Sequence, residues 1–563
     1  MALVAKGACH RPALFGFELF KHPPVAGRTG RIHHPNRAHV PVLPVLSHLV
    51  GGKALGHHVS SRQPRPILVV CLRNNRVLWR PLHRQTTSDG VYHDVRSACT
   101  GRDRLQVNGV GPAESIARSV RDGRRTAREV VEDYLEIAEA KNPGLNAFTE
   151  LDRVGALRRA DLVDAGSRAG SLSGVPIALK DLIDHAGHVT TAGSVFYRHQ
   201  AEVSAPVVER LEAAGAIILG RTGLDEFAYG GTSENPWFGV VRNPWDRNLS
   251  PGGSSGGSSV AVAAGMAPAA IGTDTGGSVR VPAAMCGTVG LKVTHGRVPL
   301  TGVFPFAGSM DTVGPLATTC GDARLVYRAV KGFDESDPWS DPRDLPGRRL
   351  GSPDGIRVAL PLDWLEWVPT SDAIRTSFET FCDRLGEAGP RVEPLQARAL
   401  VPDPVRMALS SAEAAAVHRQ WIDDPDKPYG PEVRGRVETA IQTTTDEYTR
   451  ALRWKAGLVQ AARRVFSEYD LILTPTVGHN RKTIGVDGIV VGGKRHWTGD
   501  VMGGFTSPVN VLGCPAISLP LTDEWTPPPA VQLIAPWWEE ELLLDVGEFL
   551  EQTGLVASRP PPD

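Results

Sequence analysis

The sequence predicts an α/β protein with one large domain, in which a mixed, largely parallel β-sheet lies between helical layers. Short apolar runs alternate with segments of helical length from about residue 112 onward, as a covered sheet requires. The stretch SPGGSSGGSSVAVAAGMAPAAIGTDTGGSVR, from Ser250 to Arg280, adds two Gly/Ser-rich turns around an apolar segment long enough for one helix and one strand. Those turns hold two sets of hydroxyl groups at a fixed separation.

The composition fits a soluble globular protein. The chain has 563 residues, of which 41% are hydrophobic and 22% charged, with a net charge of −1. This balance gives no global attraction to nucleic acid or to a membrane surface, and we expect neither as a partner. The seven cysteines are scattered without a C-x-x-C pair, and no apolar segment suits a signal peptide or a membrane span. We therefore expect a cytoplasmic protein without a metal site or cofactor.

Residues 1–106 differ from the rest of the chain. They are rich in Arg, His and Pro and lack sustained helical or strand periodicity, except for the strand-like PILVVCL from Pro66. A basic arm for nucleic acid or targeting would show aromatic residues or a helix face, which this segment does not. We interpret residues 1–106 as an extension that is disordered or not part of the native protein, and residues 107–563 as the globular domain.

The first half of the domain alternates helices and strands. A capping box at Thr126–Glu129 begins a helix that Asn142-Pro143-Gly144 should stop. The apolar strand 176–179 delivers Lys180 at its end. Further helices are expected at 152–165, 205–214 and 258–266, and further strands at 217–220 and 269–273.

The second half begins with a Pro/Asp/Arg-rich loop at 334–351. Its expected strands are 356–360, 471–474, 514–520 and 530–535, and its expected helices are 373–387, about 412–422, 446–468 and 539–553, the last ending at Gly554.

The Gly/Ser-rich stretch allows several interpretations. A P-loop is excluded because Gly256-Gly257 is followed by Ser258-Ser259 rather than by a lysine. A flexible linker is excluded because the flanking segments 260–266 and 269–272 are apolar. Residues 252–256 do match G-x-S-x-G, which would make Ser254 the nucleophile of an α/β-hydrolase served by His418 or His479.

Several sequence blocks occur together in a fixed order along the chain. They are GVPIALKDLIDHAGHVTTAGS, EFAYGGTSENPWFGVVRNPWD, the Gly/Ser-rich stretch, GGSVRVPAAMCGTVGLKVTHGRVPLTG, SMDTVGPLA and FTSPVNVLGCPAISLP. With these blocks, the whole of the chain from about Val107 resembles the amidase signature family of serine amidohydrolases, and a match in several ordered blocks is more specific than any single motif. Leu182 and Val293 depart from the usual pattern, where the family commonly has Asn and Pro.

The resemblance implies the amidase-signature fold and a Ser–cis-Ser–Lys triad. Ser278 is then the nucleophile, Ser254 the bridging serine with a cis peptide bond from Gly253, and Lys180 the base, whose burial should lower its pKa. The implied oxyanion hole consists of the backbone N–H groups of Thr275, Gly276, Gly277 and Ser278.

Supporting residues are assigned from the same blocks. We expect Ser255 to hydrogen-bond Lys180, Asp274 to pair with Arg280, and Asp181 to point away because neighbouring strand residues face opposite sides. Substrate contacts are expected from the loops around 496–504, with Trp497 and Phe505 as apolar candidates, and from Tyr229, Gly230, Gly231, Thr232 and Ser233.

The implied reaction is hydrolysis of a small-molecule carboxamide through a Ser278 acyl-enzyme. A homodimer is one option for the assembly. The alternatives are the glutaminase subunit of a tRNA-dependent amidotransferase, which would have partner subunits, the Ser254 hydrolase described above, and a non-enzymatic interaction protein on the same fold.

Overall fold

The protein is described by a computed structural model that covers residues 68–73, 76–81, 111–166 and 170–562. The chain divides into two units, Met1–Val95 and Arg96–Asp563. In the first unit, β1 (Leu68–Arg73) and β2 (Arg76–Pro81) form an antiparallel hairpin, where the sequence predicted a strand. The other expectations for residues 1–106 concern positions outside the described ranges.

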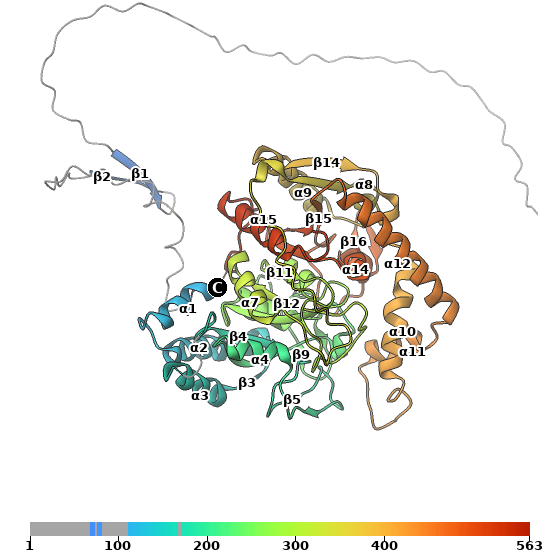
Figure 1. The fold of residues 1–563 in the computed structure, drawn as a ribbon, viewed down its shortest axis with the longest axis horizontal. Coiled ribbons are helices and arrows are strands. Elements are labelled where there is room, and N and C mark those ends of the chain that lie inside the picture. The colour runs from blue at the N-terminus through green and yellow to red at the C-terminus, as the bar shows by residue number, and fades with distance from the viewer. Residues whose placement is uncertain (1–67, 74–75, 82–110, 167–169, 563) are drawn as a thin grey trace, which may run out of the picture. The chain divides into compact units, whose positions relative to one another are not determined.

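The second unit is built on a mixed sheet of eleven strands, which confirms the predicted α/β class (Figure 1). Two parallel groups, β14–β13–β15 and β10–β4–β7, are joined by antiparallel pairs. In spatial order the strands are β14 (Arg391–Leu395), β13 (Arg357–Pro361), β15 (Leu471–Pro475), β19 (Ala530–Ile534), β18 (Ala516–Pro520), β11 (Val289–Lys292), β12 (Thr312–Ala317), β10 (Ala269–Asp274), β4 (Pro176–Lys180), β7 (Ile217–Thr222) and β3 (Phe148–Leu151).

Helices flank this sheet, and those expected from the sequence occur within a few residues of their predicted bounds. Figure 1 shows α2, α3 and α4 beside β3 and β4, and α10, α11 and α12 together on another side of the body. None of the described helices is long and apolar enough to cross a membrane. The helices are α1 (Ala113–Arg121), α2 (Ala127–Leu145), α3 (Arg153–Asp164), α4 (Pro206–Ala213), α5 (Gly256–Ala263), α6 (Arg280–Cys286), α7 (Cys320–Val330), α8 (Leu362–Trp367), α9 (Asp372–Glu387), α10 (Met407–His418), α11 (Pro431–Ile441), α12 (Thr445–Phe466), α13 (Thr498–Gly503), α14 (Ser507–Leu512) and α15 (Glu540–Gln552).

The loops contain short two-stranded antiparallel ribbons. They pair β5 (Val189–Thr190) with β6 (His199–Gln200), β8 (Glu234–Asn235) with β9 (Gly239–Val240), and β16 (Ile489–Val491) with β17 (Lys494–His496).

The predicted capping box of α2 is confirmed, but the predicted end of this helix is wrong. Thr126 Oγ1 accepts the Glu129 N–H, and the Glu129 carboxylate accepts the Thr126 N–H. The helix continues past Pro143 to Leu145, whose side chain is buried. Asn146 then ends it, because its left-handed backbone (φ 52°) and its side-chain bond to the Phe238 carbonyl suit a helix terminus.

Three segments converge at one edge of the sheet, where the carboxyl ends of β4 and β10 lie. β4 and β10 are parallel neighbours, with Leu179 opposite Ile271, so Lys180 and the turn after Asp274 leave the sheet together. α5 begins directly after residues 253–255 and is buried from Gly256 to Val262, as an all-round small and apolar helix should be. The sheet therefore brings Lys180, Ser254 and Ser278 into one region.

Candidate active site

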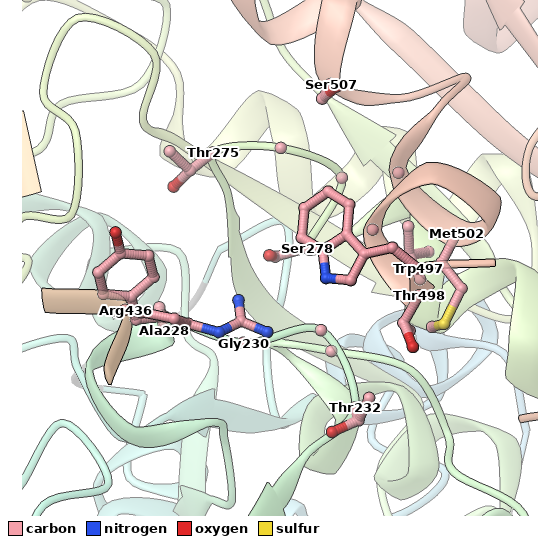
Figure 2. A pocket seen from close by; sticks show the side chains of 18 of the residues that line it. Ala228, Gly230, Thr232, Thr275, Ser278, Arg436, Trp497, Thr498, Met502 and Ser507 are labelled. Atoms are coloured by element: carbon pink, nitrogen blue, oxygen red, sulfur yellow. The ribbon is translucent and has the colours of Figure 1, made fainter. Parts of the chain in front are cut away.

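A cavity of about 410 Å³ opens at this edge of the sheet, and Ser278 lies in its wall (Figure 2). Its lining comes from seven chain segments that are distant in sequence. These are residues 228–234, 253, 275–281, 306–310, 406–436, 482–487 and 497–511, not all of which face the cavity. It combines apolar walls with a few polar groups, as small-molecule sites do.

Lys180 is completely buried next to two hydroxyl groups. Its Nζ lies 2.7 Å from Ser254 Oγ and 2.8 Å from Thr273 Oγ1. Desolvation lowers the pKa of Lys180 to about 7, although the charges of Asp225, Asp274 and Asp311 oppose this shift. A large fraction of Lys180 is therefore neutral near pH 7 and able to accept a proton.

Ser255 was expected to bond Lys180, and this expectation is wrong. Ser255 Oγ donates to the Thr273 carbonyl at 3.1 Å and accepts the Thr273 N–H at 3.2 Å. Besides Ser254, the hydroxyl that contacts Lys180 is that of Thr273, which sequence reasoning missed. The position of Thr273 could have indicated this contact. Thr273 lies near the end of β10 and Lys180 at the end of β4, and these two strands pair in parallel and end together.

The peptide bond between Gly253 and Ser254 is cis, as expected from the resemblance. Gly253 lines the cavity and has no room for a side chain, since an added Cβ would lie 2.1 Å from Asp225 Oδ2. The Ser255 N–H donates to the Ser278 carbonyl at 3.2 Å. This bond ties the segment that carries Ser254 to the turn that carries Ser278.

The Ser278 turn is organised around the buried carboxylate of Asp274. This carboxylate accepts the Gly277 N–H at 2.7 Å and pairs with the Arg280 guanidinium at 2.9 Å, as predicted. Burial opposes ionisation, but the Arg280 charge, with help from Lys292 and an Asn510 hydrogen bond, holds the pKa of Asp274 well below its usual range. Asp274 stays ionised and fixes the backbone around Ser278.

The backbone N–H groups of this turn differ in availability. Within the described ranges, those of Thr275, Gly276 and Ser278 have no acceptor in the protein. The Gly277 N–H was expected to join them, but it donates to Asp274 and is already satisfied. The Thr275 hydroxyl donates to Asp311 at 2.5 Å and the Thr506 hydroxyl to the Gly276 carbonyl at 2.7 Å, so the free donors are rigidly held.

Of the five residues expected at the substrate from segment 229–233, four line the cavity. They are Tyr229, Gly230, Gly231 and Thr232. Ser233 does not line it, because its N–H donates to Asp225 at 3.0 Å and its Oγ accepts the Gly256 N–H at 3.2 Å. Ser233 therefore supports the loop rather than contacting a ligand. Burial of the Asp225 carboxylate, which accepts the Ser233 N–H, raises the pKa of Asp225 to about 6.

The expected loop around 496–504 also contributes to the cavity. Trp497 and Met502 are among its lining residues. Phe505 is not, because it is fully buried against Trp364, with ring centroids 6.3 Å apart. Phe505 is a core residue, and its expected role at the substrate is wrong.

Three basic side chains in the cavity wall have polar partners. Lys482 Nζ lies 2.5 Å from Glu234, and Arg436 lies 2.6 Å from Glu432 on the next turn of α11. Arg406 is buried and donates to Ser507 at 3.1 Å. The Lys482 and Arg406 contacts join separate segments around the cavity.

No histidine of the described chain lines this cavity. His418 is buried, with Nδ1 3.0 Å from the Tyr429 hydroxyl, and His479 Nδ1 accepts the Arg481 N–H. Asp181 points away from Lys180 and pairs with Arg221 at 2.8 Å, as expected. Among the described residues, no cluster of His, Cys, Asp or Glu suits a metal ion. The Ser254 hydrolase alternative thus lacks the histidine that it requires.

The structure defines a mixed α/β protein in which a buried lysine contacts a serine hydroxyl near a cavity that Ser278 lines. Comparison with family models gives the family, because the model described as Amidase matches residues 129–544. The chain belongs to the Amidase family, and it is an enzyme that hydrolyses carbon–nitrogen bonds of amides.

Known proteins are similar over most of the chain. The AtzE chain of 1-carboxybiuret hydrolase from Pseudomonas sp. (strain ADP), which is named as a subunit, is 35% identical, over 78% of this chain and 98% of that protein. A glutamyl-tRNA(Gln) amidotransferase subunit from Symbiobacterium thermophilum is also 35% identical, over 78% and 96%. One similar solved structure is that of a vestigial protein complex, described as revealing the evolutionary origins of an s-triazine catabolic enzyme. Its TM-score is 0.74, with 33% identity over 80% of this chain and all of that one.

Proposed function

We propose that the protein hydrolyses a small carboxamide through an acyl-enzyme on Ser278. Ser278 Oγ attacks the amide carbon and passes its proton to Ser254 Oγ, whose own proton moves to Lys180 Nζ. The tetrahedral intermediate then expels the amine, which takes a proton from Ser254 while Lys180 returns one to Ser254. Water attacks the resulting ester by the same relay and releases the carboxylate, which restores Ser278.

One observation carries this proposal: a fully buried lysine with a pKa lowered to about 7 lies 2.7 Å from Ser254. A lysine with an ordinary pKa would be protonated near pH 7 and unable to take the proton. The N–H groups of Thr275, Gly276 and Ser278 are the proposed oxyanion donors, because they stand at the cavity wall and no described residue accepts from them.

The nucleophile can be tested by labelling. A fluorophosphonate probe should modify the peptide that contains Ser278, and Ser278→Ala should lose both labelling and amide turnover while keeping its thermal unfolding temperature. Ser254→Ala is the matched variant, since it should lose turnover but leave Ser278 as the only site of any residual labelling. Labelling at Ser254 in the parent would refute this assignment of roles.

A second candidate is the catalytic component of a larger assembly, such as a glutaminase that feeds an amidotransferase. It is favoured by the names of two similar proteins, both of which are called subunits. Native mass measurement of the protein isolated from its own source would distinguish the two. A complex with a different chain, together with glutamine hydrolysis, would support the second candidate, whereas a monomer or homodimer that hydrolyses other amides would support the free-standing amidase.

A further inference from the structure

Trp497 is a large apolar side chain left open beside the candidate nucleophile. It is 48% exposed and lines the same cavity as Ser278. In Figure 2 its indole stands in the cavity on the side of Ser278, with Met502 and Thr498 next to it. When a ligand covers exposed aromatic surface in a concave site, the burial of that surface makes binding more favourable.

The position of the indole depends on Gly499. A Cβ added to Gly499 would lie 2.3 Å from Trp497 Cη2 and 2.4 Å from Cζ3. The ring therefore lies directly over the glycine backbone, where no larger residue would leave room for it. Since Gly499 stands in the first turn of α13, the indole is backed by a helix rather than by a freely moving loop.

The rest of the cavity surface suits a flat ligand. Tyr229 and Phe306 also line it and contact each other, with ring centroids 4.5 Å apart. Met310 and Met502 add flexible thioether side chains, which pack well against aromatic rings. The cavity wall thus carries aromatic and sulfur groups in addition to the indole, and stacking with an indole favours a planar ring over a puckered one of equal size.

We infer that Trp497 determines the specificity of the enzyme, and that the amide substrate carries a flat aryl group which packs against its indole. The inference rests on the proposed function, because it takes Ser278 as the point where the amide bond is cleaved.

Matched substrate pairs test it. Benzamide and cyclohexanecarboxamide differ in the flatness of the acyl ring, and acetanilide and N-cyclohexylacetamide in that of the amine ring. We expect kcat/KM of the parent to favour the aryl member of at least one pair, which also identifies the side of the amide that Trp497 contacts. Trp497→Leu keeps an apolar side chain but not the ring, and should reduce this preference by about two- to tenfold.

Three further variants sharpen the result. Gly499→Ala retains the indole but displaces it, and should reduce the aryl preference as Trp497→Leu does. Trp497→Phe keeps a flat ring and should retain most of the preference. Trp525→Ala is the control, since Trp525 is 55% exposed but outside the cavity, and should leave both ratios unchanged.

The outcomes separate this inference from the proposed function. Equal turnover of both members of each pair, or a preference that survives in Trp497→Leu, overturns the role of Trp497. Labelling of Ser278 without turnover of either aryl amide overturns it as well. Absence of both labelling and turnover refutes the proposed function itself.

Discussion

The titration of Lys180 is the most direct test of the proposed mechanism. The neutral amine is the form that accepts a proton, so amide turnover should increase with pH as Lys180 loses its charge. Burial lowers the pKa of Lys180 to about 7. We therefore expect kcat/KM to rise through a single limb centred near pH 7 and to level off above it, with low activity at pH 5.

The size of the effect follows from this pKa. At pH 7 about half of Lys180 is neutral, whereas a lysine with the ordinary value of 10.5 would be neutral in roughly three molecules in ten thousand. Burial thus increases the available base by about a thousandfold. Arginine cannot supply a neutral side chain at these pH values, so Lys180→Arg should lose at least about a thousandfold in amide turnover, as Lys180→Ala should.

The assay compares two leaving groups. Release of ammonia from an amide requires protonation of the departing nitrogen. A p-nitrophenyl ester instead releases a phenolate, which departs without being protonated. Both Lys180 variants should therefore retain a larger share of their activity on the ester than on the amide. Substantial amide turnover by Lys180→Arg, or an amide profile that is flat between pH 5 and 9, would show that Lys180 is not the base.

Four other predictions follow from contacts around the cavity. Thr273→Val removes an acceptor of the Lys180 ammonium, so the pH limb should move to lower pH with a smaller kcat, and Thr273→Ser should restore both. Ser255→Ala should lower the free energy of unfolding by about 1 kcal/mol and leave the pH limb in place, because Ser255 bonds the Thr273 backbone rather than Lys180. Gly277→Ala should reduce turnover at least about tenfold and lower the unfolding temperature, since φ is +131° and a Cβ would lie 2.2 Å from Thr506 Oγ1. A chain that begins at Val107 should keep its turnover and unfolding temperature, because the eleven-stranded sheet and the cavity lie within residues 111–562, and a large loss of either would contradict this.

Periodicity and local chemistry were sufficient to predict much of the fold. The capping box at Thr126 and the apolar run before Lys180 are local patterns, and both elements occur where they were expected. The mixed α/β class followed from the alternation of such elements. The order of the eleven strands was not predicted, because it depends on pairings between segments far apart in the chain, such as β15 with β19.

The site was predictable to the level of segments but not of individual contacts. Ser255, Gly277 and Ser233 lie in the expected segments, yet each is occupied by a local bond that the sequence does not reveal. Phe505 lies next to the lining residues but faces the core. Which side of a turn a residue faces is decided by φ and ψ at one or two positions, and a match between sequence blocks carries no information at that scale.

A lowered pKa does not by itself make a lysine a catalytic base, as a second buried lysine demonstrates. Lys292 is as deeply buried as Lys180, and burial also lowers its pKa to about 7. Its Nζ, however, donates to the carbonyls of Val293 and Cys514, which accept hydrogen bonds but have no proton to give. Lys180 instead contacts the hydroxyls of Ser254 and Thr273, and a hydroxyl both gives and takes a proton. Partner chemistry, more than pKa, therefore supports the proposed proton transfer at Lys180, whereas Lys292 joins the end of β11 to the segment just before β18.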